Sequence, residues 1–371
     1  MLTSPYHVFS LSLKVYMYVL VPATLLPESA GSIERERERE REREMGYSLL
    51  MVVVVGWAVG LTGACLVGGG AGGGSLLREN AYETSCPDAE SIVFSWVENA
   101  AAQDPRMAAS LLRLHFHDCF VNGCDASVLL DDTATFVGEK SAAPNVNSLR
   151  GFEVIDGIKG DLEMACPQTV SCADILAMAA RDSVLLSGGP TWQVQLGRKD
   201  SLTASKAAAN NNIPGPNSNV ANLVSKFQNV GLTPQDMVTL SGAHTIGMAR
   251  CSTFRSRLQS NSGDDVDREF LASLQQLCSV NSNMTLAVLD VGTPAVFDNE
   301  YYANLASGQG LLSSDQALFA EGGITREVVE NYASDTEFFF KNFRMSMLRM
   351  GAIKPLTGSS GEIRRNCRSI N

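Results

Sequence analysis

The sequence predicts a mostly α-helical protein with few, short strands. Apolar residues recur at helical spacing over several long segments between residues 88 and 351, the pattern of helices that bury one face. Capping residues, prolines and glycines stand at the ends of these segments. Alternating patterns typical of strands are rare and short, so we expect little sheet.

The first helical segment is DAESIVFSWVENAAAQDPRMAASLLRLHFHDCF, residues 88–120, and Pro105 predicts that it is divided into two helices. A further helix is expected over 171–189, where Ser171 can cap the N-terminus and a Gly-Gly pair ends the pattern.

Thr233-Pro234-Gln235-Asp236 is a strong helix start, and we expect this helix to run toward His244. The last helix, 335–351, places phenylalanine and methionine side chains on one side, which is typical of core packing. The best strand candidate is WQVQLGRKD, 192–200, and ANNNIPGPNSN, 209–219, is expected to be loop.

The N-terminal part does not resemble a folded domain. Residues 34–44 read ERERERERERE, which fits a solvated charged run or, as we prefer, a dinucleotide repeat read in frame. We therefore interpret 1–44 as a mis-annotated leader and Met45 as the true start. Residues 45–75 are predicted to be a signal peptide cleaved near 70–76; a membrane anchor is the alternative. The segment 76–371 is then one domain.

Charge and cysteines indicate a secreted protein. The 371-residue chain has a net charge of −11 and no basic stripe, which argues against nucleic-acid binding. Of nine cysteines, Cys65 lies in the apolar leader, so cleavage leaves eight, an even set typical of disulfides formed in an oxidising compartment. Spacing alone leaves their pairing open. A zinc site is less favoured because no C-x2-C pair occurs.

Two of the chain's four histidines lie in RLHFHDCF, 113–120. On a helix, Arg113, Phe116 and His117 share one face, whereas His115 points away from His117. The pair is therefore not expected to chelate one metal. An arginine one turn before His117 favours a functional role for that histidine, and His115 is expected to belong to the scaffold.

Two segments are rich in oxygen ligands. DCFVNGCDAS, 118–127, offers the side chains of Asp118, Asp125 and Ser127 and two backbone carbonyls, a set that suits calcium, or else an Asx-rich turn closed by a disulfide. LDVGTPAVFDN, 289–299, offers a second such loop. In LSGAHTIG, 240–247, small residues beside His244 allow a flat group to approach; a histidine stabilising a helix C-terminus is the alternative. Asp315 is a candidate partner for a histidine.

The motifs RLHFHDC and LSGAHT, together with the cysteine separations, resemble the class III secretory plant haem peroxidases. The resemblance covers 76–371, from SCPDA at 85–89 to EIRRNCR at 362–368. It implies a two-lobed, mostly helical fold with haem b between a distal and a proximal side. It also implies a monomer that reduces hydrogen peroxide and oxidises small phenolic donors in one-electron steps.

By that resemblance, His244 is the proximal iron ligand and Asp315 accepts its second ring N–H. His117 is the distal base, oriented by Asn145, which is backed by Glu139. Arg113 stabilises charge as the O–O bond breaks, Phe116 screens the iron from bulky donors, and donors approach near Pro214. Ala143 and Thr253 stand where some members carry aromatic residues, so we expect a more open access channel.

The resemblance also implies two calcium ions and four disulfides. The expected distal calcium ligands are Asp118, Val121, Gly123, Asp125 and Ser127. The expected proximal ligands are Thr245, Asp290, Thr293, Val296 and Asp298. The implied disulfide pairs are Cys86–Cys166, Cys119–Cys124, Cys172–Cys367 and Cys251–Cys278.

After signal cleavage we expect no stable membrane insertion. One glycosylation sequon begins at Asn283, and the short tail after Cys367 favours the cell wall over the vacuole. The main alternative function is a secreted, calcium-binding, disulfide-stapled wall protein without haem. A zinc hydrolase fits less well because H-E-x-x-H is absent.

Overall fold

Pro105 separates the first two helices, α2 (Ala89–Gln103) and α3 (Met107–Cys119), as the sequence predicted. The computed structural model describes residues 77–259, 266–279 and 284–371. The leader 1–44, the segment 45–75 and Asn283 lie outside the described residues, so the predictions for them stay predictions. The described residues belong to one unit, Gly73–Asn371.

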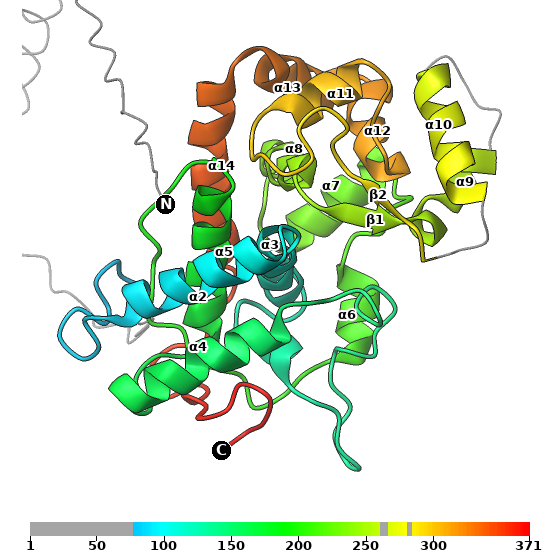
Figure 1. The fold of residues 1–371 in the computed structure, drawn as a ribbon. Helices are drawn as coiled ribbons and strands as arrows, with labels where there is room; N and C mark the ends of the chain where they lie inside the picture. The colour runs from blue at the N-terminus through cyan, green and yellow to red at the C-terminus, as the bar shows by residue number, and fades with distance from the viewer. Residues whose placement is uncertain (1–76, 260–265, 280–283) are drawn as a thin grey trace, which may run out of the picture. The chain divides into compact units, whose positions relative to one another are not determined.

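Two groups of helices make up this unit (Figure 1). In the first, α2 and α3 pack with α4 (Phe152–Ala165) and α5 (Cys172–Leu186). The second group packs around α8 and α13; its members are α7 (Val220–Asn229), α8 (Pro234–Ser241), α11 (Glu300–Ala306), α12 (Ser313–Ala320), α13 (Gly323–Ser334) and α14 (Thr336–Gly351).

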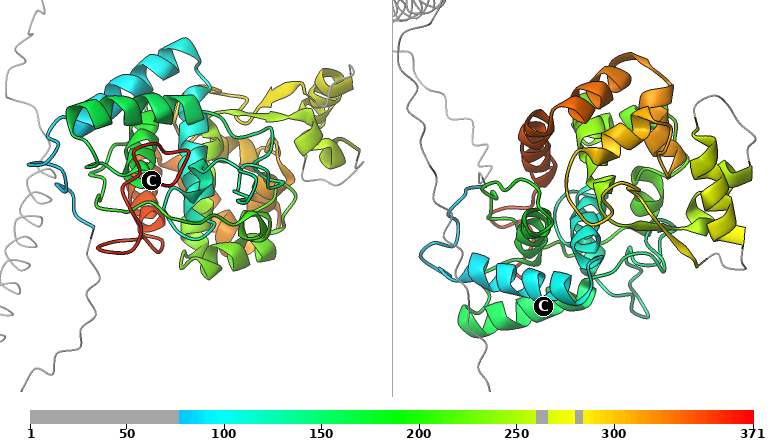
Figure 2. Two further views of the ribbon diagram at one scale, coloured as in Figure 1. Left: turned by 90° about the horizontal axis from the view of Figure 1, so that it is seen from below. Right: turned by 45° about the horizontal axis from the view of Figure 1, so that its top comes forward.

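The remaining short elements connect or flank these groups; they are η1 (Ser127–Leu129), α6 (Lys206–Asn212), η2 (Gly242–Thr245), η3 (Cys251–Thr253), α9 (Arg255–Gln259) and α10 (Arg268–Ser279). In the described part the only sheet pairs β1 (Met248–Arg250) with β2 (Leu286–Val288) antiparallel, Met248 opposite Val288. Figure 2 shows the same elements from two further sides. The mostly α-helical fold class is confirmed.

Sequence-coded caps fix the helix starts. The Ser171 hydroxyl accepts a hydrogen bond from the Asp174 backbone N–H and begins α5. Thr233 and Asp236 form a complete capping box at the start of α8, with Pro234 in the first turn. On α14, Phe339, Phe343, Met347 and Met350 are buried, so this stripe is core, as expected.

Two local predictions were wrong. Residues 192–200 form no strand and contribute only isolated bridges at Leu196, Lys199 and Asp200, because their pairing partners are single residues of distant segments. The first residues of 209–219 belong to α6, whose start is capped by Ser205. The helix predicted from Thr233 toward His244 is confirmed: α8 ends at Ser241, and His244 lies directly after it in the tighter turn η2.

The four implied disulfides are confirmed: Cys86–Cys166, Cys119–Cys124, Cys172–Cys367 and Cys251–Cys278. The bridge from Cys172 to Cys367 spans 195 residues and ties the start of α5 to the C-terminal segment. Closing so long a loop removes entropy from the unfolded chain and stabilises the fold by roughly 5 kcal/mol in the chain-entropy model. Among the described helices, none is both long and apolar enough to cross a membrane.

Candidate active site

The α3 helix presents Arg113, Phe116 and His117 together, as their spacing predicted, because residues three and four apart share a helix face. His117 is buried, and the Phe116 ring packs edge-on against it with ring centroids 5.4 Å apart. The Arg113 guanidinium donates hydrogen bonds to the Pro144 carbonyl at 2.9 Å and to the Ser148 hydroxyl at 3.1 Å. These neutral partners hold the guanidinium without cancelling its charge.

The His117 ring has a defined hydrogen-bonding role. Its Nδ1 lies 2.6 Å from the Asn145 side-chain oxygen, and the Asn145 amide donates to the Glu139 backbone carbonyl at 2.9 Å. Because the amide nitrogen is engaged there, Asn145 presents its oxygen to the ring and Nδ1 must carry the hydrogen. Nε2 is then left with a lone pair. The resemblance implied that Glu139 backs Asn145, and the contact between them in the structure runs through the Glu139 backbone carbonyl.

Burial lowers the pKa of His117 well below its usual value, and the positive charge of Arg113 lowers it further, while the Asn145 hydrogen bond opposes both. His117 is therefore a neutral imidazole at ordinary pH. Burial, followed by the charge of Arg250, lowers the pKa of Arg113 to about 10, so the guanidinium stays protonated. This pair combines a proton acceptor with a fixed positive charge.

On the other side, His244 lies in η2, directly after α8. Its Nδ1 is 2.9 Å from Asp315 Oδ1, at the start of α12. Burial would lower the pKa of His244, but the Asp315 carboxylate outweighs this effect and raises it. The His244 side chain is 38% exposed while that of Asp315 is 4% exposed, so Nδ1 is anchored on a buried carboxylate while part of the ring stays accessible.

Two partners of these residues had not been predicted. Ser148 orients Arg113, and the Tyr301 hydroxyl donates a second hydrogen bond to Asp315 Oδ1 at 3.1 Å. The only sequence signal for Ser148 was its place three residues after Asn145. Nothing local linked Tyr301 to Asp315, because their contact depends on how α11 packs against α12.

The segment after α3 gathers buried oxygen atoms. Asp118, Asp125 and Ser127 are all buried, with Asp118 accepting from the Ala126 N–H at 2.9 Å. Burial and the neighbouring Asp125 raise the pKa of Asp118 well above its usual value. Among the residues that the structure describes, the buried Ser127 Oγ and Glu139 Oε2 find no hydrogen-bond partner. Such unsatisfied, acidic oxygens suit a bound cation.

Two backbone features near this cluster concern the expected calcium ligands Gly123 and Val121. Gly123 has a φ of +130°, and a Cβ there would lie 2.5 Å from the Lys354 carbonyl oxygen, so glycine is needed. The Val121 carbonyl accepts a hydrogen bond from the Asn212 side chain at 3.0 Å, which leaves it one lone pair for a metal.

The second oxygen-rich loop closes on Thr245, the neighbour of His244. Its hydroxyl lies 3.0 Å from Asp290 Oδ2, 3.2 Å from Asp298 Oδ1 and 3.4 Å from the Val296 carbonyl. The Thr293 hydroxyl is 3.0 Å from Asp298 Oδ1. The fold thus brings together all five residues that the resemblance assigned to a proximal calcium site.

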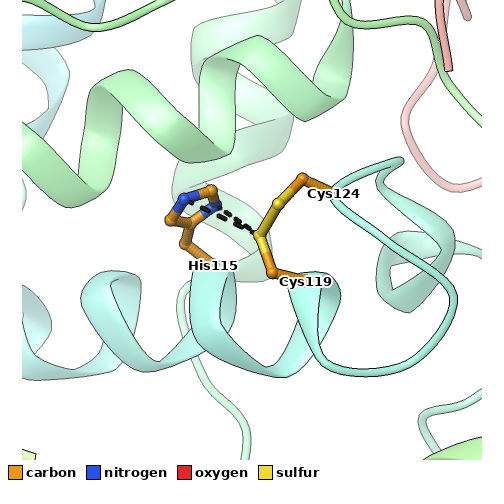
Figure 3. A group of neighbouring side chains, drawn as sticks. All are labelled: His115, Cys119 and Cys124. Atoms are coloured by element: carbon orange, nitrogen blue, oxygen red, sulfur yellow. Dashed lines mark hydrogen bonds between the residues drawn. A yellow bond between two sulfur atoms is a disulfide. The ribbon is translucent and has the colours of Figure 1, made fainter. Parts of the chain in front are cut away.

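His115 lies apart from these groups, as predicted. Its ring packs on the Cys119–Cys124 disulfide with nitrogen–sulfur distances of 3.7 and 3.8 Å (Figure 3). Although the three side chains lie close enough to surround an ion, the 2.03 Å S–S bond occupies both sulfurs, so no thiolate is available. Burial, then the charge of Arg198, lowers the pKa of His115 to about 3.

Pro214 lies in the loop after α6, next to the buried Ile213. A shallow surface hollow adjoins it, lined by Gly215, Pro216, Asn217, Ser218, Asn219 and Asn222. Four of its six lining residues are asparagine or serine, and the Ser256 hydroxyl donates to the Asn217 side-chain oxygen at 3.2 Å.

Comparison with known proteins decides the family. Residues 93–335 match the family model described as Peroxidase. The chain is 63% identical over 298 residues to Peroxidase 40 of Arabidopsis thaliana, covering 78% of this chain and 84% of that protein. The chain belongs to the class III plant peroxidases.

Other relatives of this peroxidase are similar over comparable lengths. Peroxidase 9 of Arabidopsis thaliana is 54% identical over 304 residues, covering 80% of this chain and 88% of that protein. Peroxidase 4 of Vitis vinifera is 53% identical over 298 residues, covering 80% and 92%. The protein is therefore an oxidoreductase acting on peroxide, and the alternative of a wall protein without haem finds no support.

Proposed function

We propose that this peroxidase binds haem b between α3 and η2, uses hydrogen peroxide as oxidant and removes single electrons from small phenolic donors. One observation carries the proposal. His117 and His244 are each anchored through Nδ1 by a separate partner, and the positive charge of one arginine, Arg113, acts to lower the pKa of both.

The residues present fit haem. His244 Nδ1 is anchored to Asp315 and the side chain is partly exposed, so Nε2 is the candidate iron ligand. Neither Arg113 nor Arg250 forms an ion pair within the described residues, so both could face an anionic group. When bound, haem would supply the redox chemistry, while Asp315 would make the imidazole a stronger donor to the iron.

The chain's own residues would manage protons and charge. His117 Nε2 can accept a proton from one peroxide oxygen and return it to the other, because Nδ1 is committed to Asn145. Arg113 can stabilise the negative charge on the departing oxygen. Phe116, packed against His117, would exclude bulky donors from the peroxide site.

Donors would reach the haem edge beside Pro214. Neither Ala143 nor Thr253 is aromatic, which supports an open approach for phenols. The asparagine and serine side chains of the hollow beside Pro214 favour phenols with additional polar groups.

The two oxygen clusters support two calcium ions. Each directly follows a proposed functional histidine in the chain, His117 before Asp118 and His244 before Thr245. Calcium bound there would hold α3 and η2 in place. The buried carboxylates would be costly without a cation, since burial raises the pKa of both Asp118 and Asp125.

We further propose that the signal peptide is cleaved near 70–76 and that the protein is exported to the cell wall as a monomer. The four disulfides support export, because they form in an oxidising compartment.

Absorption spectroscopy with His244→Ala and His117→Ala tests the proposed roles. The parent protein should show a Soret band that shifts on adding peroxide. His244→Ala should weaken haem binding, whereas His117→Ala should keep the band and slow the peroxide-induced shift by about 10²–10⁴-fold. A parent protein without a Soret band after haem reconstitution would refute haem binding. A His117→Ala variant reacting at the parent rate would refute the distal base.

A further inference from the structure

The helix α6 ends in three successive asparagines, residues 210–212, whose side chains have different surroundings. The Asn210 side-chain oxygen accepts a hydrogen bond from the Ala143 backbone N–H at 2.8 Å. The Asn212 amide donates to the Val121 carbonyl at 3.0 Å, in the turn directly after α3. Asn211, between them, is exposed, and among the described residues its side chain makes no hydrogen bond. The first and third asparagines therefore fasten α6 to segments that border the proposed distal side.

The segment that follows α6, residues 213–216, is held by the second group of helices. The Lys226 ammonium, on α7, donates to the Ile213 carbonyl at 3.2 Å. The Ser314 backbone N–H, at the start of α12, donates to the Pro216 carbonyl at 2.9 Å. The chain between these contacts is thus fixed to α7 and α12 on one side and, through the preceding asparagine, to the turn after α3 on the other.

Two prolines make this segment depend on the residues around it. Pro214 and Pro216 have no backbone N–H, so neither can anchor the chain by donating a hydrogen bond. Gly215, between them, has no side chain to pack. The position of Pro214 is therefore set by the donors that hold its neighbours, above all the side chains of Asn212 and Lys226.

The other side of the Asn212 contact is held in place without it. Val121 donates its backbone N–H to the last turn of α3 at 3.2 Å, and it lies inside the short loop closed by the Cys119–Cys124 disulfide. When the asparagine contact is lost, we expect the turn after α3 to stay in place and the segment 213–216 to move.

We propose that Asn212 is a positioning residue that holds Pro214 at the haem edge and thereby sets the affinity for phenolic donors. This inference rests on the proposed donor approach beside Pro214. Loss of the contact weakens donor binding alike before and during electron transfer, so KM rises while kcat changes little. The reaction with peroxide at His117 keeps its rate, because α3 does not move.

Absorbance titration of the haem-loaded enzyme with guaiacol, a small phenol, measures donor binding before any turnover. Asn212→Asp keeps the size of the side chain but replaces the amide donor with a carboxylate, which the Val121 carbonyl repels. The Kd for guaiacol should rise roughly fivefold, an effect of the size that one hydrogen bond supports. Asn211→Asp places the same charge one residue earlier, in solvent, and its Kd should stay within about twofold of the parent value.

Two further variants and one rate measurement separate the donor contact from a general effect on folding. Asn212→Gln retains an amide donor and should bind guaiacol more tightly than Asn212→Asp. Lys226→Met keeps an unbranched side chain, removes the donor to the Ile213 carbonyl and should also raise the Kd. Stopped-flow mixing of each variant with hydrogen peroxide should give a rate constant within about twofold of the parent.

Three results would overturn the positioning role: a parental Kd in Asn212→Asp, an equal rise in Asn211→Asp, or a peroxide rate constant that falls as far as the donor affinity. Each would leave the haem function intact. A parent protein with neither a Soret band nor guaiacol turnover would instead refute the function on which the inference rests.

Discussion

His117 Nδ1 lies 2.6 Å from the side-chain oxygen of Asn145, and this contact leaves Nε2 as the one proton acceptor of the ring. Two features keep that acceptor available. Burial and Arg113 hold the imidazole neutral, and the Glu139 backbone carbonyl prevents the Asn145 amide from rotating. In the described part of the chain no carboxylate is hydrogen-bonded to the His117 ring, so the base at this site depends on neutral and cationic neighbours.

Replacing Asn145 with Asp should make the enzyme sensitive to acid. A carboxylate beside Nδ1 raises the pKa of His117, so the imidazole becomes protonated at higher pH than in the parent. The rate constant for reaction with peroxide should fall at mildly acidic pH and recover as the pH rises. Stopped-flow measurements across the pH range check this. Asn210→Asp, an exposed change that adds the same charge beside Ala143, is the control, and a parent-like profile in Asn145→Asp would contradict the expectation.

His115 should make the fold less stable in acid. Its pKa is about 3 in the folded state, against about 6.5 in the unfolded chain. Between these values the unfolded state binds the additional proton, so stability falls as the pH decreases, by up to about 1.4 kcal/mol per pH unit. His115→Gln removes this contribution.

Urea unfolding at several pH values, with the disulfides intact, measures that effect. His115→Gln should show a shallower dependence on pH below about 6.5 and the same dependence as the parent near pH 8. Equal slopes below 6.5 would show that His115 is protonated in the folded protein.

Asp298→Asn should remove one calcium ion of two. Asp298 contacts both Thr245 and Thr293, so its loss opens the loop that borders His244. We expect metal analysis to find one calcium per chain, with a lower melting temperature and a weaker Soret band. Asp156→Asn, which breaks a surface ion pair with Arg368, should retain both ions. Two retained ions in Asp298→Asn would place the calcium elsewhere.

Asp315 should set the redox potential of the bound iron. Asp315→Asn weakens the hydrogen bond at His244 Nδ1, so the imidazole donates less charge and the ferric–ferrous potential should rise. Tyr301→Phe should move the potential in the opposite direction, because Asp315 loses its second donor and attracts the His244 proton more strongly. Spectroelectrochemical titration measures both, and shifts of the same sign would contradict this account.

The helices were largely predictable because their signals are local. Pro105, Ser171 and the Thr233–Asp236 capping box mark helix ends through contacts within one turn, and the structure preserves each of them. The strand prediction for 192–200 was wrong because an alternating pattern alone does not supply a neighbouring strand. The bridge partners of this segment are single residues of distant segments, such as Arg78 and Glu362.

The sequence by itself determined the helical fold class, the shared face of Arg113 and His117, and, through its motifs, the family. Only the tertiary structure decided which atoms meet. Tyr301 reaches Asp315, Asn145 turns its oxygen toward His117, and Asn212 reaches the Val121 carbonyl, because segments distant in sequence pack side by side. Local preferences act over a few residues, whereas these contacts depend on side chains brought together by burial of the core.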